Sequence, residues 1–216
     1  MIKRNKGMLI LTSIVILIPM LVGLLLWSKL PEQIPSHWNI NGEVDGWSSK
    51  AFVVFAIPAI MLGFHWICVL ASSLDPKSKG YHSKMVLLVL WIIPVISLVL
   101  CSLVYTAALG YSLNVQIIMP LLVGLMFIIV GNLLPKCRQS YTLGIKLPWT
   151  LASEENWNKT HRFSGKVWVI GGVVTMATAF LGSFWILLGV LALMVIIPTV
   201  YSYMHYRKHA QEKEDE

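Results

Sequence analysis

The amino-acid sequence predicts an all-α, polytopic integral membrane protein with six transmembrane helices and both termini in the cytoplasm. Three observations lead to this fold class. The mean hydropathy of +0.72 is far above that of soluble domains, and only 12% of the 216 residues are charged. Apolar runs long enough to cross a bilayer recur along the whole chain.

The positions of these apolar runs define the predicted spans. A crossing helix needs roughly 20 apolar residues to cover a hydrocarbon core about 30 Å thick. The fifth run is short, and only Gly182 and Ser183 separate it from the sixth, so we expect these two spans to form a tight helical hairpin. The predicted spans are residues 7–27, 51–71, 85–109, 115–134, 166–181 and 183–204.

The basic residues lie almost entirely on one side of this six-span map. Of the 17 Lys and Arg residues, only Lys29 and Lys50 fall in segment 28–50, and segment 110–114 carries no charge. Basic residues resist translocation, so the basic side is predicted to be cytoplasmic. The net charge of +7 is explained by this rule and by contact with anionic lipid, and it does not indicate nucleic-acid binding.

The composition argues against several kinds of chemistry. The three cysteines do not suggest a disulfide framework, and no metal-binding or cofactor-binding motif is present, so we expect no metal and no cofactor. The interiors of the spans lack acidic and basic residues, which argues against ion-coupled transport. His65 is the one histidine within a predicted span. Its neighbour Trp66 favours an interfacial position over a pH-sensitive site.

Segment 28–50 is the sizeable outward-facing segment. Two prolines stiffen it, and Asn41-Gly42 and Asp45-Gly46 each predict a turn. Aromatic anchors beside a few polar groups are typical of a docking surface for an apolar or amphipathic ligand, although a simple lid between two helices would look the same. His37 and Asp45 are too few ligands for a metal site. The predicted ligand-binding residues are Pro35, His37, Trp38, Asn39, Gly42, Asp45 and Trp47.

Segment 135–166 is the long inward-facing segment. Ser153 resembles a helix N-cap, and Glu155 can pair with Lys159 one turn later. The pattern predicts an interfacial helix that turns into the fifth span near Gly165. Such a helix either fixes topology or presents a surface to a soluble partner. The predicted partner-binding residues are Lys136, Arg138, Trp149, Thr150, Trp157, Thr160, His161 and Arg162.

Both loops carry motifs that resemble the SdpI family of membrane proteins. The outer stretch from Leu30-Pro31 through His37-Trp38-Asn39 to Lys50 is similar to a small domain of unknown function (DUF1648) found at the start of such proteins. The inner loop is similar to their carboxyl-terminal signature. The matching residues are Gly131-Asn132, Pro135-Lys136, Gly144-Ile145, Pro148-Trp149-Thr150-Leu151, Trp157, Thr160-His161-Arg162 and Gly165-Lys166.

The resemblance implies a role and a division of the chain. The family's namesake is an immunity protein of the plasma membrane of a Gram-positive bacterium. It protects cells from a secreted toxic peptide and draws a soluble winged-helix repressor to the membrane. The implied division is a two-helix unit over residues 1–71, central helices three and four over 72–134, and the signature with helices five and six over 135–216.

Two other functions remain open from the sequence. A transporter or efflux protein for amphiphilic molecules or lipids would also have apolar spans. A membrane-embedded enzyme could use Thr160 and His161 with Glu154 or Glu155. The enzyme is disfavoured because adjacent residues on a helix point about 100° apart. We therefore expect no catalytic residues, and we expect membrane lipid, a toxic peptide and a repressor as partners.

Overall fold

The computed structural model describes residues 2–214, and their side chains through Lys208. It consists almost entirely of helices, five of which are long and apolar enough to cross a membrane: Lys3–Leu25, Phe52–Leu74, Ser83–Ala108, Val115–Lys136 and Phe184–Lys208. The all-α membrane fold class is therefore confirmed in its main feature. The chain forms two compact units, residues 1–74 with 86–115, and residues 75–85 with 116–216. The two helices of the expected central part, 72–134, fall largely into different units.

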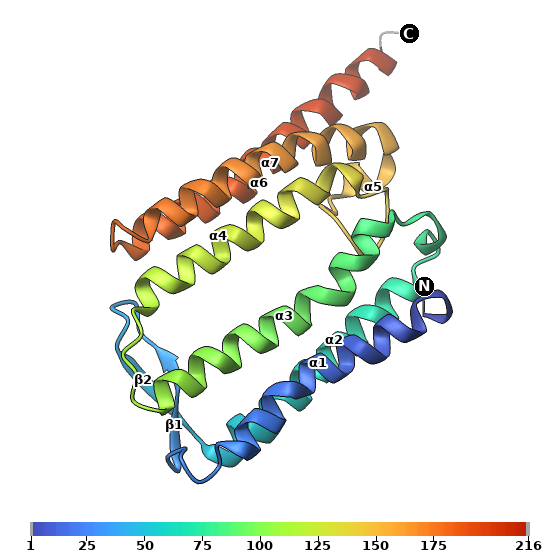
Figure 1. Ribbon diagram of the computed structural model, residues 1–216. Helices are drawn as coiled ribbons and strands as arrows, with labels where there is room; N and C mark the ends of the chain where they lie inside the picture. Colours follow the sequence, from blue (N-terminus) through green and yellow to red (C-terminus); the bar gives the residue numbers. More distant parts are fainter. Residues whose placement is uncertain (1, 215–216) are drawn as a thin grey trace. The chain divides into compact units, whose positions relative to one another are not determined.

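The first unit holds three long helices and a hairpin (Figure 1). Its elements are the 3-10 helix η1 (Lys3–Asn5), α1 (Lys6–Leu25), strands β1 (Gln33–Trp38) and β2 (Val44–Ser49), the π-helix η2 (Phe52–Ala56), α2 (Ile57–Leu74) and most of α3 (Ser83–Ala108). The two strands form an antiparallel ribbon, so the structure is not purely helical as predicted. A core at the hairpin end of the helices joins Leu30, Ile34, Val53, Val54, Cys101 and Tyr105.

Close packing between α1 and α3 depends on one glycine. A Cβ atom on Gly23 would lie 2.6 Å from the Tyr105 hydroxyl, so only glycine leaves room for this side chain. Tyr105 then donates a hydrogen bond of 2.9 Å to the carbonyl oxygen of Pro19. Membrane helices tolerate an internal proline when another group satisfies the local backbone.

His65 of α2 packs against α1. Its side chain is fully buried in the first unit, and Nε2 lies 3.1 Å from the Thr12 hydroxyl of α1. A buried polar side chain costs free energy unless it finds a partner, and here the two helices supply partners to each other. The sequence could not show this because Thr12 and His65 are distant along the chain.

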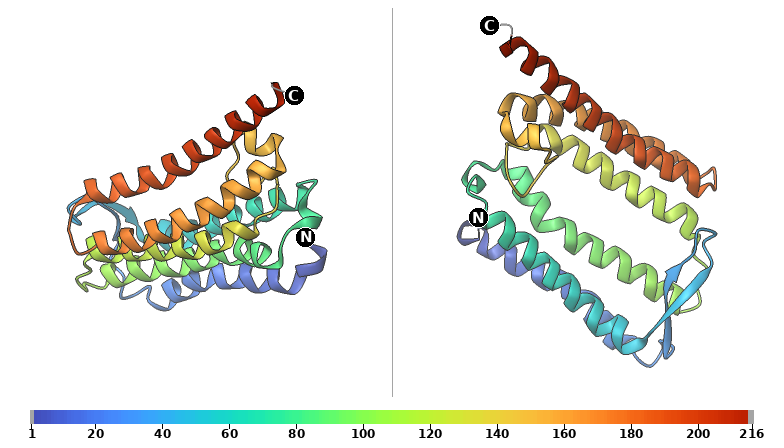
Figure 2. Two further views of the ribbon diagram at one scale, coloured as in Figure 1. Left: turned by 90° about the horizontal axis from the view of Figure 1, so that it is seen from above. Right: turned by 180° about the vertical axis from the view of Figure 1, so that it is seen from behind.

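The second unit contains α4 (Val115–Leu133), η4 (Leu134–Lys136), α5 (Pro148–Ala152), α6 (Glu154–Thr178) and α7 (Phe184–Glu214), with η3 (Ser78–Gly80) in its first segment. Helices α4, α6 and α7 run side by side (Figure 2). Glycines let α4 and α6 approach closely in antiparallel register. A Cβ atom on Gly172 would lie 2.6 Å from the Gly124 carbonyl oxygen, and one on Gly165 would lie 2.8 Å from that of Gly131. Small residues at such contacts are typical of helix packing in membranes.

Helix α6 differs from the prediction. The expected interfacial helix and the short fifth span form one uninterrupted helix of 25 residues, with no turn at Gly165. Its first half is polar, and it is not among the five apolar helices described above. Six polar residues of α6 are buried against its neighbours, and hydropathy by itself does not detect this helix. The buried polar residues are Asn156, Thr160, His161, Ser164, Thr175 and Thr178.

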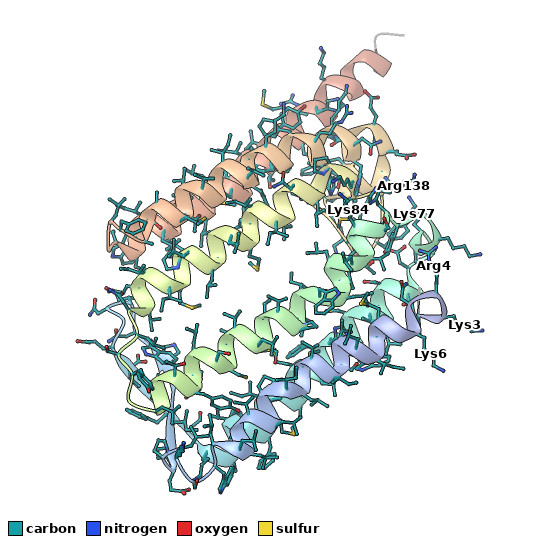
Figure 3. All side chains as sticks on the ribbon, viewed as in Figure 1. Lys3, Arg4, Lys6, Lys77, Lys84 and Arg138 are labelled. Atoms are coloured by element: carbon teal, nitrogen blue, oxygen red, sulfur yellow. The ribbon has the colours of Figure 1, made fainter. Side chains whose placement is uncertain are left out.

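Basic residues gather at one end of each unit. In the first unit, Lys3, Arg4 and Lys6 lie at the start of α1, at the opposite end of this helix from the hairpin (Figure 3). In the second unit, Lys77 and Arg138 lie at the end where α4 stops and α6 begins. The charge segregation predicted from the sequence is thus present within each unit.

Candidate functional site

The outer loop is an ordered β-hairpin fixed to the ends of its helices. Ile34 pairs with Ser48 across the two strands, and Pro35 pairs with Trp47. Ile34 is fully buried in the core with Val53 and the other apolar residues of that end. The hairpin therefore has a buried anchor on one side and exposed residues on the other.

Two predicted ligand-binding residues form the turn of this hairpin. Asn39 Oδ1 accepts hydrogen bonds from the backbone N–H groups of Asn41, at 2.9 Å, and Glu43, at 3.0 Å. Asn39 Nδ2 donates to the Glu43 carboxylate at 3.0 Å. Gly42 has a φ of 78°, which a residue with a Cβ atom rarely adopts. The predicted turn at Asn41-Gly42 is confirmed, whereas Asp45-Gly46 lies within strand β2 and forms no turn.

The exposed face of the hairpin carries the other predicted residues. Trp47 is 58% exposed, and Ile40 at the turn is similarly open. His37 Nδ1 contacts Asp45 Oδ1 across the strands, with both side chains exposed. Trp38 is half-buried. This surface combines apolar groups with one polar pair. In the part of the chain that the structure describes, no three His, Cys, Asp or Glu residues are grouped as metal ligands would be.

Lys50 was not predicted as a site residue, yet it holds the base of the hairpin. Its buried Nζ donates hydrogen bonds of 3.2 Å to the carbonyl oxygens of Trp27 and Leu30, beyond the end of α1. It also pairs with the Glu32 carboxylate at 2.8 Å and lies over the Trp27 ring. A cation that binds carbonyl groups at a helix carboxyl end is favoured by the helix dipole. The hairpin is therefore tied to α1.

In the second unit, the inner segment 137–147 folds onto a buried aspartate that the sequence analysis did not single out. Asp75 Oδ2 accepts hydrogen bonds from the Tyr81 hydroxyl (2.7 Å), from the Tyr141 N–H (2.8 Å), and from both the N–H and the hydroxyl of Thr142 (3.0 Å each). Oδ1 accepts from the Lys77 N–H at 2.8 Å.

These contacts stabilise the charged form of Asp75. Burial acts to raise the pKa of the carboxyl group, but the hydrogen bonds from Tyr81, Lys77, Thr142 and Tyr141 outweigh it and lower the pKa to about 2. A signal for this residue was present, because Asp75 is the sole acidic residue between positions 46 and 153.

His161 of α6 is a buried structural residue that contacts segment 137–147. Nδ1 donates to the Trp157 carbonyl oxygen at 2.8 Å, so Nε2 accepts from the Ile145 N–H at 2.9 Å. The imidazole also stacks on the buried Trp157 ring, with 4.1 Å between centroids. Gly144 is required beside it, since its φ is +105° and a Cβ atom would lie 2.5 Å from His161 Nε2.

A second buried network connects α5, α6 and α7. Thr160 Oγ1 lies 2.9 Å from both Asn156 Oδ1 and Ser202 Oγ, and Asn156 Nδ2 donates to the Ser202 carbonyl oxygen at 3.1 Å. Trp149 Nε1 donates to Ser202 Oγ at 2.8 Å. Thr160 and His161 therefore bind different groups, and they do not form a nucleophile and base pair.

Thr150 shapes the turn before α5. Its buried hydroxyl accepts from the Leu147 N–H at 2.9 Å and lies equally close to the carbonyl oxygen of Ile145. The Gln139 side chain then donates to the Thr150 carbonyl oxygen at 3.0 Å and contacts Lys77 Nζ through its own oxygen. These contacts connect residues 75–85, the first segment of the second unit, to segment 137–147 and to α5.

The predicted partner-binding residues thus divide into two groups. Thr150, Trp157, Thr160 and His161 are buried, so they position the surface and do not contact a soluble partner in this conformation. The residues that remain accessible are Lys136 and Trp149, both half-buried, and Arg138 and Arg162, both exposed. The predicted N-cap is confirmed, since Ser153 Oγ accepts from the Asn156 N–H at 3.1 Å, and so is the Glu155–Lys159 pair at 2.7 Å.

Comparison with known proteins identifies two regions of similarity. Residues 136–202 match the SdpI/YfhL protein family, and residues 14–62 match a domain of unknown function (DUF1648). The chain is 30% identical to the Immunity protein SdpI of Bacillus subtilis (strain 168), over 95% of this chain and 97% of that protein. No solved structure matches the chain. Region 14–62 contains the hairpin of the first unit, and region 136–202 contains the network around Ser202 in the second, whereas Asp75 lies outside both regions. The chain belongs to the SdpI/YfhL protein family.

Proposed function

We propose that this bacterial multi-pass membrane protein is an immunity protein that protects the cell against a secreted toxic peptide. The similarity to the Immunity protein SdpI carries the proposal, because it extends over nearly the full length of both chains. An immunity protein must meet its toxin at the cell surface, and the hairpin offers an ordered surface at one end of the first unit.

The proposal includes six spans with the basic ends in the cytoplasm. Helix α6 has 25 residues and is therefore about 37 Å long, enough to cross a bilayer. It packs along α4 through the paired glycines and along α7 through Trp168, whose Nε1 donates to the Met194 carbonyl oxygen at 3.1 Å. A helix packed along two spanning neighbours crosses with them. With α6 counted, both ends of the chain lie on the basic side, in agreement with the charge rule.

In this orientation the hairpin faces outward and supplies the toxin-binding surface. The exposed Trp47 and Ile40 can bury apolar side chains of an amphipathic peptide, and the pair His37 and Asp45 can bind its polar groups. Pro35 is buried and Asn39 and Gly42 form the turn, so these three residues support the surface. A rigid surface binds with a smaller entropic cost than a flexible loop.

Survival of toxin-challenged cells tests the proposal. A sensitive strain that expresses the protein should survive a dose of the sporulation-delay type of peptide that kills the same strain with an empty vector. Trp47→Ala should reduce protection at unchanged membrane expression. Trp185→Ala is the matched control, because it removes an exposed tryptophan from α7 in the other unit. Equal killing with and without the wild-type protein would refute the immunity role.

We further propose that the inner surface recruits a soluble winged-helix repressor. Its contact residues would be Arg138, Arg162, Lys136 and Trp149, held by the buried networks of α5, α6 and α7. Recruitment must depend on the toxin, and a ligand shifts a conformational equilibrium only when it binds one state more tightly. The hydrogen-bonded surface around Asp75 and His161 would differ between the two states.

Localisation of a fluorescent repressor tests the signalling proposal separately from protection. With toxin present, the wild-type protein should bring the repressor to the membrane, and Arg138→Gln should abolish this while cells still survive. Lys159→Gln serves as a control, because this lysine lies on α6 and is already paired with Glu155. A repressor that reaches the membrane equally well with Arg138→Gln would argue against this surface.

A further inference from the structure

A groove of about 610 Å³ opens between α4 and α6 at the basic end of the second unit. Its floor is the close contact of Gly131 with Gly165, where the two backbones nearly touch. Arg162 and Lys166 line one end, and Val169 and Ile170 line the other. The groove therefore changes from cationic to apolar along the helix axis.

The two cations lie on one stripe of α6 with Ile170. Residues four apart on a helix share a face, so Arg162, Lys166 and Ile170 follow one another along the groove. Both basic side chains are exposed. Neither forms an ion pair with a carboxylate among the side chains that the structure describes, whereas Lys159 on the same helix is paired with Glu155. Two unpaired cations beside a groove can bind one phosphate group.

The apolar end of the groove indicates what kind of phosphate-containing ligand it binds. Helix α4 is apolar enough to span a membrane, and Val169 and Ile170 lie alongside it, deeper than the cations. Ile170 is 64% exposed, which suits contact with an acyl chain better than contact with water. A free phosphate ion would use only the cationic end, whereas a phospholipid has a charged head and an apolar tail in the same order as the groove.

We infer that this groove binds an anionic phospholipid of the cytoplasmic leaflet. Its phosphate is held by Arg162 and Lys166, and one acyl chain lies along Val169 and Ile170. Basic pockets between membrane helices bind such headgroups. The site is distinct from the hairpin surface. Arg162 is the one residue named in both the groove and the proposed repressor surface. A variant of Lys166 therefore tests lipid binding without changing a repressor-contact residue.

Native mass spectrometry of the purified protein tests the inference. In detergent with added phosphatidylglycerol, the wild-type protein should retain one lipid molecule more tightly than it retains phosphatidylcholine. Lys166→Gln and Arg162→Gln should each weaken phosphatidylglycerol binding about fivefold. Lys159→Gln should bind as the wild type does. Inorganic phosphate at millimolar concentration should not displace the lipid.

Three results would overturn the inference. These are equal binding of the two lipids, unchanged phosphatidylglycerol binding by the double variant of Arg162 and Lys166, and displacement by inorganic phosphate. One further variant guards against misfolding. Lys166→Arg keeps the charge and should retain binding. Loss of binding in Lys166→Arg, in a protein that still unfolds cooperatively, would also contradict the proposal.

Discussion

At the residue scale, a group of polar side chains in the second unit is used inside the protein. Asp75, Thr150, Thr160 and His161 are all nearly inaccessible. Asp75, Thr160 and His161 bond to groups distant in the sequence, whereas the Thr150 hydroxyl bonds to Leu147 and Ile145 just before it. A buried polar group that loses its partner costs about 1–3 kcal/mol. These residues therefore contribute to function by fixing the shape of a surface that other residues present.

Replacing Asp75 with Asn should destabilise the second unit by about 2–3 kcal/mol, because an amide nitrogen cannot accept the hydrogen bonds that the carboxylate accepts. Thermal unfolding in detergent would measure the loss. The matched control is Asp45→Asn, which changes an exposed aspartate in the hairpin and should leave unfolding nearly unchanged.

Asp75 should also make the free energy of unfolding depend on pH. The pKa of Asp75 is about 2 in the folded protein and 3.8 ordinarily, so the unfolded chain takes up its proton first as the pH falls. The stability that Asp75 contributes is complete above about pH 4 and is lost as the pH falls toward 2. Across that window the wild-type unfolding temperature should drop more steeply than that of Asp75→Asn. Parallel curves would show that Asp75 is not the group responsible.

Replacing Gly144 with Ala should lower stability by more than replacing Gly110 with Ala. Both glycines have positive φ, +105° and +89°, so an alanine is strained at either position, at a cost on the order of 1–3 kcal/mol. Only at Gly144 would the new Cβ atom meet neighbours, at 2.5 Å from His161 Nε2, whereas nothing lies within 4 Å at Gly110. Equal shifts in unfolding temperature would mean that the contact with His161 is unimportant.

At the element scale, α4 and α6 illustrate what the sequence could and could not reveal. The helical period of the sequence indicates a face that joins Trp157, His161, Ser164 and Trp168, and the residue type of Ser153 indicates the cap. The continuity of α6 was not recognised, because a polar first half is typical of an interfacial helix. Burial of that half requires partners on α7 and on the inner loop, such as Ser202 and Ile145, which the local sequence does not specify.

The hairpin gives a similar result on a smaller scale. Asn41-Gly42 correctly indicated a turn, since a local dipeptide determines local geometry. The strands themselves were missed because two prolines and irregular pairing around His37 obscure the alternation of apolar and polar residues. Lys50 was missed as well, because its partners at the end of α1 are recognisable only in three dimensions.

The glycine contacts between α4 and α6 lead to a prediction at this scale. Gly172→Ala should destabilise the second unit by about 1–3 kcal/mol, because the added Cβ atom would lie 2.6 Å from the Gly124 carbonyl oxygen. Gly63→Ala in α2 is the control, since nothing lies within 4 Å and alanine favours a helix by up to about 1 kcal/mol. The comparison uses unfolding in the same detergent. A neutral Gly172→Ala would argue against tight packing of α4 on α6.

At the scale of the whole molecule, charge distribution predicted the helical membrane fold and the segregation of basic residues within each unit. These features depend on composition and on regular periods, which a sequence displays directly. The number of spans depends instead on α6, whose polar first half sets it apart from the five apolar helices. Topology is therefore the property to measure first.

Cysteine labelling of intact cells should show the orientation. In a protein whose native cysteines (Cys68, Cys101 and Cys137) are replaced by Ser, Ile40→Cys should react with a membrane-impermeant maleimide. Asn158→Cys, at an exposed position of α6, should react only after the cells are permeabilised. The reverse pattern would place the hairpin in the cytoplasm and refute both the toxin and the repressor assignments.

The polarity of α6 also bears on how the chain enters the membrane during synthesis. Its buried Asn156 and Thr160 find their partner at Ser202, which the ribosome adds only after α6 is complete. Until then Asn156 and Thr160 can bond only to each other within α6, and the hydrogen bonds to Ser202 are missing, at a cost of about 1–3 kcal/mol for a buried group left without its partner. We therefore expect α6 to remain in the translocon until α7 has been synthesised, so that these two helices enter the membrane as a pair.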